Sequence, residues 1–167
     1  MSSDTMQGHV YQINRKGETA NERGLPKLSV YRGKIKFHGL EGDFNRYRHE
    51  SRRDNPNMAL LIMPLEMIDQ LNFDGWPVKP GDLGENITTV GIPYSEISHS
   101  NLFKIGDSVI QISGRCDPCK NLYTLSYVGE ERGPEFLKIL VNRRGWYARV
   151  LKEGEISVGN KIERFYG

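Results

Sequence analysis

The amino-acid sequence predicts a mainly β protein, an antiparallel β-barrel with a few short helices. Segments in which apolar and polar residues alternate recur along the chain, as expected for strands with one buried face. Eighteen glycines, many of them beside aspartate, glutamate or asparagine, separate these segments. Strand-like and helix-like segments do not alternate, which argues against a parallel α/β sheet and favours a closed or nearly closed barrel.

The expected strands follow one another along most of the chain. Alternating patterns predict strands at residues 9–13, 33–37, 108–112 and 146–151. A short β-prone segment at 156–158 follows the last of these after Lys-Glu-Gly-Glu at 152–155. This glycine-containing connection predicts a tight hairpin in which these two strands pair.

Two helices and one loop are also expected. The first helix begins at Pro64, since proline is favoured in a first helical turn, and its apolar face consists of Leu65, Ile68 and Leu71. The second helix begins at Pro134, and its inner face consists of Phe136, Leu137, Leu140 and Val141. Residues 14–25 are polar and flanked by glycine, and we expect a mobile loop there.

Length, charge and hydropathy limit the function. A chain of 167 residues suits a single domain over residues 1–167. A net charge of +2 is too small to indicate a nucleic-acid-binding protein, so such a partner is not expected. The longest apolar run, 59–63, ends at Pro64 and is far shorter than the roughly 20 residues of a membrane span. Because the first residues resemble no targeting signal, we expect a cytoplasmic protein without a membrane partner.

The segment with the most specific chemistry contains the two cysteines, Cys116 and Cys119, in Gly-Arg-Cys-Asp-Pro-Cys-Lys at 114–120. The flanking cations Arg115 and Lys120 favour a thiolate, the state required of a nucleophile or a metal ligand. A redox dithiol, a structural zinc site and two ordinary thiols remain as alternatives. Thioredoxin-type dithiols occur in βαβ units, which the pattern lacks, and the four histidines offer no second paired spacing for zinc.

A glycine-rich segment at 80–91 is a second candidate site. Glycines such as Gly84 let backbone N–H groups approach a ligand closely, and Asn86 and Thr88 add neutral donors. The segment could therefore hold an anion. The same composition also suits an ordinary sharp turn, so both interpretations stay open.

Residues 46–53 contain four arginines, together with Tyr47 and His49. Arginine binds phosphate oxygens through its planar fork, and aromatic rings stack on nucleobases or a pterin. A solvated basic loop is the alternative interpretation, and a small RNA-binding barrel is a further one that salt-dependent affinity for single strands would test. Arg143 and Arg144 form a smaller cluster open to the same two interpretations.

Taken in order, these segments resemble the MOSC family, the C-terminal domain type of molybdenum-cofactor sulfurases. The resemblance covers residues 8–162 as a core. It depends on Gly-Leu-Pro-Lys at 24–27, Gly-Leu-Glu-Gly-Asp at 39–43, the segment 81–89 with Gly-Glu-Asn-Ile-Thr-Thr, Asp-Pro-Cys-Lys at 117–120, and a final hairpin at 145–154 and 158–162. Residues 44–49 depart from the family pattern, in which a histidine often follows the aspartate.

The resemblance implies a β-barrel of the type also found in pyruvate kinase, with molybdopterin-bound molybdenum in a cleft. The family cysteine corresponds to Cys119, which the resemblance implies to be the catalytic residue and a molybdenum ligand, or else the residue that carries sulfur. The residues expected to bind the cofactor are Cys119, Lys27, Arg115, Gly84, Glu85, Asn86 and Thr88. Lys27 and Arg115, with the backbone of residues 84–86, would hold the pterin phosphate.

Two functions follow from this resemblance. In the first, the protein is a molybdoenzyme that removes oxygen from an N-hydroxylated small molecule, with Cys119 as the protein ligand of the metal. In the second, it is a non-catalytic carrier of the molybdenum cofactor or of sulfur bound to Cys119. The sequence shows no pyridoxal-phosphate domain, so we expect a separate protein to donate electrons or sulfur.

Overall fold

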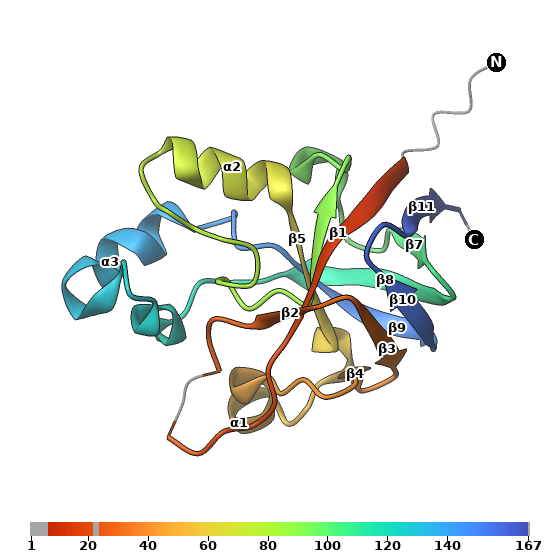
Figure 1. The fold of residues 1–167 in the computed structure, drawn as a ribbon, viewed down its shortest axis with the longest axis horizontal. Helices are drawn as coiled ribbons and strands as arrows, with labels where there is room; N and C mark the ends of the chain where they lie inside the picture. Colours follow the sequence, from red (N-terminus) through yellow and green to blue (C-terminus); the bar gives the residue numbers. More distant parts are fainter. Residues whose placement is uncertain (1–6, 22–23, 167) are drawn as a thin grey trace.

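The computed structural model describes residues 7–21 and 24–166, and seven strands in it close a barrel (Figure 1). Their order around the barrel is β11–β7–β8–β9–β5–β6–β1, and β1 pairs back with β11. An eighth strand, β2, extends the sheet beside β1. The strands are β1 (Gln7–Arg15), β2 (Leu28–Val30), β5 (Leu60–Pro64), β6 (Ile87–Val90), β7 (Leu102–Ile105), β8 (Ser108–Arg115), β9 (Trp146–Lys152) and β11 (Lys161–Phe165).

The predicted β-barrel is confirmed, but the sheet is mixed and not purely antiparallel. Strands β5 and β6 run parallel, with Ile62 opposite Ile87. The chain between them contains the helix α2 (Leu65–Phe73) and so forms a crossover, which parallel neighbours require. The helix was predicted from its own apolar spacing, but that spacing does not show that it connects two adjacent strands.

A small second sheet contains β10 (Gly154–Ser157), β3 (Arg32–Lys36) and β4 (Gly39–Leu40). The hairpin predicted between the last strands is therefore wrong, because β10 pairs with β3 and β9 pairs with β5 and β8. At Gly154 the backbone passes very close to the backbone of Asp107, so close that an added Cβ would lie 2.5 Å from the Asp107 carbonyl carbon. The Asp107 N–H also donates to the carbonyl of Glu155 at 3.1 Å, and these contacts direct the chain away from β9.

The helix α2 agrees closely with its prediction. It starts directly after Pro64, and both Ile68 and Leu71 are buried. The second predicted helix, α3 (Gly129–Ile139), begins five residues earlier than expected, so Pro134 lies inside it. Its first turn carries two glutamates, which the positive end of the helix dipole stabilises. Phe136 is buried as predicted, whereas Val141 is 55% exposed and lies beyond the helix.

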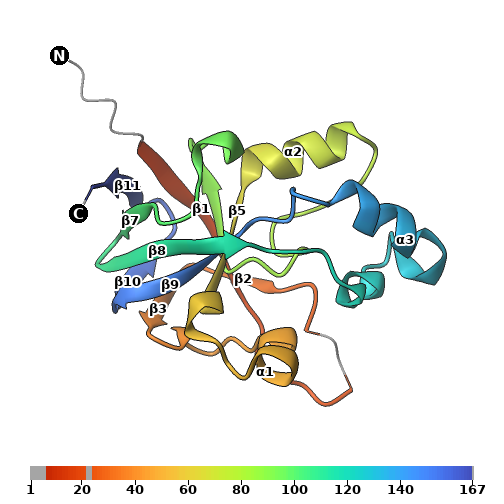
Figure 2. The ribbon, with the colours of Figure 1, turned by 180° about the vertical axis from the view of Figure 1, so that it is seen from behind.

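A third helix, α1 (Arg46–Arg52), was not predicted, and it contains the arginine-rich segment. Asn45 caps it by accepting a hydrogen bond from the Arg48 N–H at 2.9 Å. Three 3-10 turns complete the helical structure: η1 (Pro56–Met58), η2 (Tyr94–Glu96) and η3 (Lys120–Thr124). The helix α1 lies on the side of the molecule opposite α2 in both ribbon views (Figures 1 and 2).

Two apolar clusters form the core. One fills the barrel, and more than half of its buried residues are isoleucines, which come from strands of both sheets and from the loops between them. The other lies between the barrel and the helices α2 and α3, which sit together on the side away from β7 and β11 (Figures 1 and 2). Trp76 and Phe136 stack in this second cluster, with ring centroids 4.7 Å apart. Among the described residues, none of the helices combines the length and the hydropathy of a membrane span.

The loop predicted at residues 14–25 is shorter than expected. Asn14 and Arg15 still belong to β1, where they pair with β2. Residues 22 and 23, which the prediction of mobility includes, lie outside the described part of the chain.

Candidate functional site

Cys119 lies in a pocket between the end of β8 and the start of η3. The pocket has two lobes that share Tyr47, Cys119 and Tyr147. The narrow lobe, of about 40 Å³, is also lined by Lys27, Arg46, Gly84 and Arg144. The open lobe, of about 330 Å³, is also lined by Arg52, Asn57, Arg115 and Asp117. The sulfur-bearing residue therefore faces a confined space and an open one.

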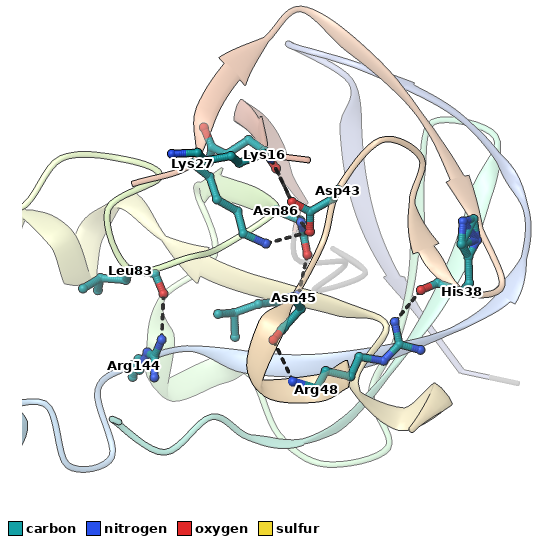
Figure 3. Close-up of polar contacts among 11 residues, drawn as sticks. Lys16, Lys27, His38, Asp43, Asn45, Arg48, Leu83, Asn86 and Arg144 are labelled. Carbon is teal, nitrogen blue, oxygen red and sulfur yellow. Dashed lines mark hydrogen bonds and ion pairs between the residues drawn. The ribbon is translucent and has the colours of Figure 1, made fainter. Parts of the chain in front are cut away.

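A buried arginine, Arg144, holds the Cys119 sulfur in place. Its Nη1 donates to the Cys119 sulfur at 3.3 Å and to the carbonyl of Asp117 at 3.0 Å. Its Nη2 donates to the carbonyl of Leu83 at 3.3 Å (Figure 3), and its Nε has no partner among the described residues. Burial by itself lowers the pKa of Arg144, but the two nearby cysteines raise it, and the net direction is upward. The guanidinium therefore stays charged beside the sulfur.

The sequence pattern does not connect Arg144 with Cys119, because the two are 25 positions apart and no spacing rule relates them. The pattern pointed to the flanking cations Arg115 and Lys120 instead. Arg115 lies over the Trp146 ring, 5.1 Å from its centroid, and lines the open lobe, while Lys120 is exposed. In the part of the chain that the structure describes, neither side chain forms a hydrogen bond with Cys119, so the cation in contact with the sulfur is Arg144.

The second cysteine, Cys116, has a different environment. It is 2% exposed, and its thiol donates weakly to the carbonyl of Asp117 at 3.7 Å. Burial raises the pKa of the Cys116 thiol, although Arg144 and a hydrogen bond from Tyr147 act in the opposite direction. A buried thiol of this kind is chemically inert. Of the two cysteines, Cys119 is the one that lines the pocket.

Lys27 lies on the wall of the narrow lobe and is held by Asp43 (Figure 3). Its ammonium nitrogen is 2.6 Å from a carboxylate oxygen of Asp43, and both side chains are at least 91% buried. The same oxygen accepts from the Asn86 side chain at 2.8 Å, and the other oxygen accepts from the Lys16 N–H at 2.9 Å. An ammonium group carries three donors, so Lys27 can also donate to a ligand in the lobe.

Only Gly84 from the glycine-rich segment lines the pocket. A carboxyl oxygen of Glu85 accepts from the Gly81 N–H at 2.5 Å, and Thr88 accepts from the Asn14 side chain at 3.1 Å. The N–H groups of Gly84 and Asn86 donate to the carbonyls of Gly81 and Leu61. The geometry therefore gives no support to a phosphate site formed by Glu85, Asn86 and Thr88, because these groups already bond within the protein.

The arginines of α1 separate into three environments. Arg48 is buried and donates to the carbonyls of His38, Asn55 and Asp54, so it holds the turn after the helix (Figure 3). Arg46 pairs with Glu50 at 3.1 Å and lines the narrow lobe. Arg52 lies over the Tyr47 ring and lines the open lobe. The segment is thus neither a solvated loop nor a single basic patch.

A metal site formed by several protein ligands is not evident. Within residues 7–21 and 24–166, no group of three or more histidine, cysteine, aspartate or glutamate side chains is placed to hold a metal ion.

Comparison with known families supports the resemblance noted from the sequence. The sequence model of the MOSC domain matches residues 47–163, which is more than half of the chain. This chain belongs to the MOSC domain family. It is 25% identical over 158 residues to YflK, an uncharacterized protein of Bacillus subtilis, and 26% identical over 163 residues to a protein of Gibberella moniliformis named as a reductase.

These matches cover 89% and 81% of this MOSC chain, but only 64% and 28% of the two relatives. The chain therefore spans less than two thirds of either relative.

Solved structures confirm the fold of this MOSC chain. The YuaD protein from Bacillus subtilis superposes with a TM-score of 0.79 at 16% identity, covering 98% of this chain and 99% of YuaD. YiiM from Geobacillus stearothermophilus superposes with a TM-score of 0.71 at 21% identity, covering 95% of this chain and 75% of YiiM.

Proposed function

We propose that this MOSC protein binds the molybdenum cofactor at Cys119 and reduces N-hydroxylated compounds. The observation that carries the proposal is the position of the Cys119 sulfur, which lies where the two lobes meet and accepts a hydrogen bond from buried Arg144. Soft thiolate sulfur suits a metal that is already bound by dithiolene sulfur. A relative of the chain that is named as a reductase adds support.

The side chains of the narrow lobe suit the charge and the ring of an anionic, flat cofactor, although the lobe, of about 40 Å³, holds only part of such a molecule. Lys27, Arg46 and Arg144 line it and carry positive charge, which suits a pterin phosphate. The rings of Phe44, Tyr47 and Tyr147 line it as well and suit a planar pterin. When bound, the cofactor would supply two-electron redox chemistry.

The chain itself contributes binding, orientation and a hydrogen-bond donor. Cys119 supplies one sulfur ligand, and Arg144 fixes that sulfur through a hydrogen bond. Burial and the neighbouring Cys116 raise the pKa of Tyr147, so its hydroxyl stays protonated at neutral pH. The open lobe adjoins the same sulfur and leaves room for a small substrate beside the cofactor.

The test is to purify the protein from a host that makes the cofactor, and to measure molybdenum and pterin fluorescence. Reduction of 6-hydroxylaminopurine with a reduced viologen dye would support the proposal. Bound cofactor without turnover would support the carrier function instead. Protein that contains neither molybdenum nor pterin would contradict both functions.

A further inference from the structure

Two arginines of the open lobe are uncommitted donors. Arg52 is at the end of α1 and Arg115 at the end of β8, and both line the lobe together with Cys119. Among the described residues, neither has a carboxylate or carbonyl partner, whereas Arg46 pairs with Glu50 and Arg143 with Asp74. The guanidinium groups of Arg52 and Arg115 therefore border the same lobe, and neither donates to a carboxylate or carbonyl of the described residues.

Each of these arginines lies over an aromatic ring. The Arg52 guanidinium is 5.1 Å from the Tyr47 ring centroid, and the Arg115 guanidinium is 5.1 Å from that of Trp146. Stacking restricts the side chain and leaves its N–H edge available, which lowers the entropy cost of binding an anion. A guanidinium edge binds a carboxylate or a phosphate through two parallel hydrogen bonds.

The rest of the lobe suits a small planar molecule. Tyr47 and Tyr147 present aromatic rings, and Asn55 and Asn57 add amide groups. Ser113 is committed, since its hydroxyl donates to the carbonyl of Asn57. Asp117 also lines the lobe, so its single negative charge offsets only one of the two arginines.

On the basis of the proposed function, we propose that the open lobe selects an N-hydroxylated planar substrate that also carries a carboxylate or phosphate, bound by Arg52 and Arg115. The anionic group would lie at the arginines and the N–OH group toward Cys119. The reaction remains the proposed one, in which the N–O bond breaks, two electrons and two protons are taken up, and water leaves. The reduced viologen dye supplies the electrons.

The first experiment compares neutral and acidic substrates on the cofactor-loaded protein, with rates expressed per bound molybdenum. The pairs are benzamidoxime with 4-carboxybenzamidoxime, and the ribonucleoside of 6-hydroxylaminopurine with its 5′-monophosphate. Two partly exposed ion pairs that together contribute about 1.4 kcal/mol predict a kcat/KM about tenfold higher for the acidic member. The pair with the larger ratio identifies carboxylate or phosphate as the preferred anion.

Variants connect this preference to the two arginines. Arg52→Gln and Arg115→Gln should each lower the ratio of acidic to neutral kcat/KM by roughly three- to fivefold. Arg53→Gln is the matched control, because Arg53 is an exposed neighbour that does not line the lobe. The preference should also weaken at high ionic strength, since salt screens exposed charges.

A second experiment needs no cofactor. In the apoprotein, 4-carboxybenzamidoxime should slow alkylation of Cys119 by iodoacetamide. The Arg52→Gln, Arg115→Gln double variant should need an about tenfold higher concentration of this compound for the same protection. Equal kcat/KM for both members of each pair, or ratios unchanged in the variants, would overturn this inference and leave the reductase function standing. If the loaded protein reduces none of the four compounds, the proposed function fails, and the alkylation result then decides the inference alone.

Discussion

Cys116 and Cys119 are three residues apart in the sequence, but the structure gives them different environments. Cys116 is buried, and burial raises the pKa of its thiol. Cys119 borders both lobes, and its sulfur accepts from a guanidinium at 3.3 Å. The two cysteines therefore differ in burial and in their contact with Arg144.

The residue-scale prediction compares serine substitutions at the two cysteines. Cys119→Ser should abolish reductase activity and strongly reduce bound molybdenum, because a serine hydroxyl is a harder ligand that remains protonated. Cys116→Ser should keep most of the activity and most of the bound molybdenum, since Cys116 lines neither lobe. Metal analysis and single-substrate kinetics on the two purified variants provide the measurement. Equal losses in both variants would contradict Cys119 as the sole protein ligand.

The segment before β6 contains a buried carboxyl group that makes stability depend on pH. Glu85 is completely buried, and burial raises its pKa from 4.5 to about 8, although the Gly81 N–H acts in the opposite direction. Below pH 4.5, both folded and unfolded chains hold this proton. Between pH 4.5 and about 8, the unfolded chain releases the proton and the folded chain keeps it. Stability therefore falls as the pH rises through this range.

The first element-scale prediction uses Glu85→Gln, which stays neutral and keeps an acceptor for the Gly81 N–H. At pH 5, wild type and variant should have similar free energies of unfolding. At pH 9, the variant should be more stable than the wild type by up to roughly 4 kcal/mol. The reason is that folding of the wild type at this pH must either bury the carboxylate charge or take up a proton, whereas the variant does neither. Urea unfolding at pH 5, 7 and 9 measures the difference, and parallel pH profiles would show that Glu85 does not titrate in this way.

The second element-scale prediction concerns the bend between β9 and β10. A Cβ on Gly154 would lie 2.5 to 2.7 Å from three backbone atoms of Asp107 and Ser108. Backbone atoms cannot move aside as the end of a flexible side chain could. Gly154→Ala should therefore lower the free energy of unfolding by about 2 kcal/mol. Gly114→Ala is the matched control, because no atom lies within 4 Å of the added carbon. Equal urea midpoints for the two variants would disprove the steric role of Gly154.

At the scale of the whole molecule, the pocket joins parts of the chain that are far apart in the sequence. Lys27 follows β1, Arg46 and Tyr47 begin α1, Cys119 follows β8, and Arg144 precedes β9. A ligand in this pocket contacts all of these segments only in the folded state. Binding should therefore stabilise the fold as a unit.

The whole-molecule prediction compares protein made with and without cofactor synthesis in the host. At a free ligand concentration of 100 times Kd, binding adds about 2.7 kcal/mol of stability. For a chain of this size, this should raise Tm by roughly 5 to 10 °C. Calorimetry measures the shift, which Cys119→Ser should reduce and Cys116→Ser should retain. A Tm that is independent of cofactor content would count against binding in this pocket.

Much of the fold, together with the family, could be predicted from the sequence. The alternating segments correctly placed strands near residues 9–13, 33–37, 108–112 and 146–151, because alternation records which face of a strand is buried. The spacing of Ile68 and Leu71 located α2 for the same local reason. The ordered motifs identified the MOSC family and singled out Cys119.

Pairing between distant segments was decided only by the tertiary structure. Local periodicity shows that a segment has a buried face, but it does not show which segment lies beside it. The parallel β5 and β6 pair and the pairing of β10 with β3 therefore became evident only in the closed barrel. Arg144 reaches Cys119 for the same reason, since their contact across 25 residues depends on how the barrel closes and not on the residues beside either one.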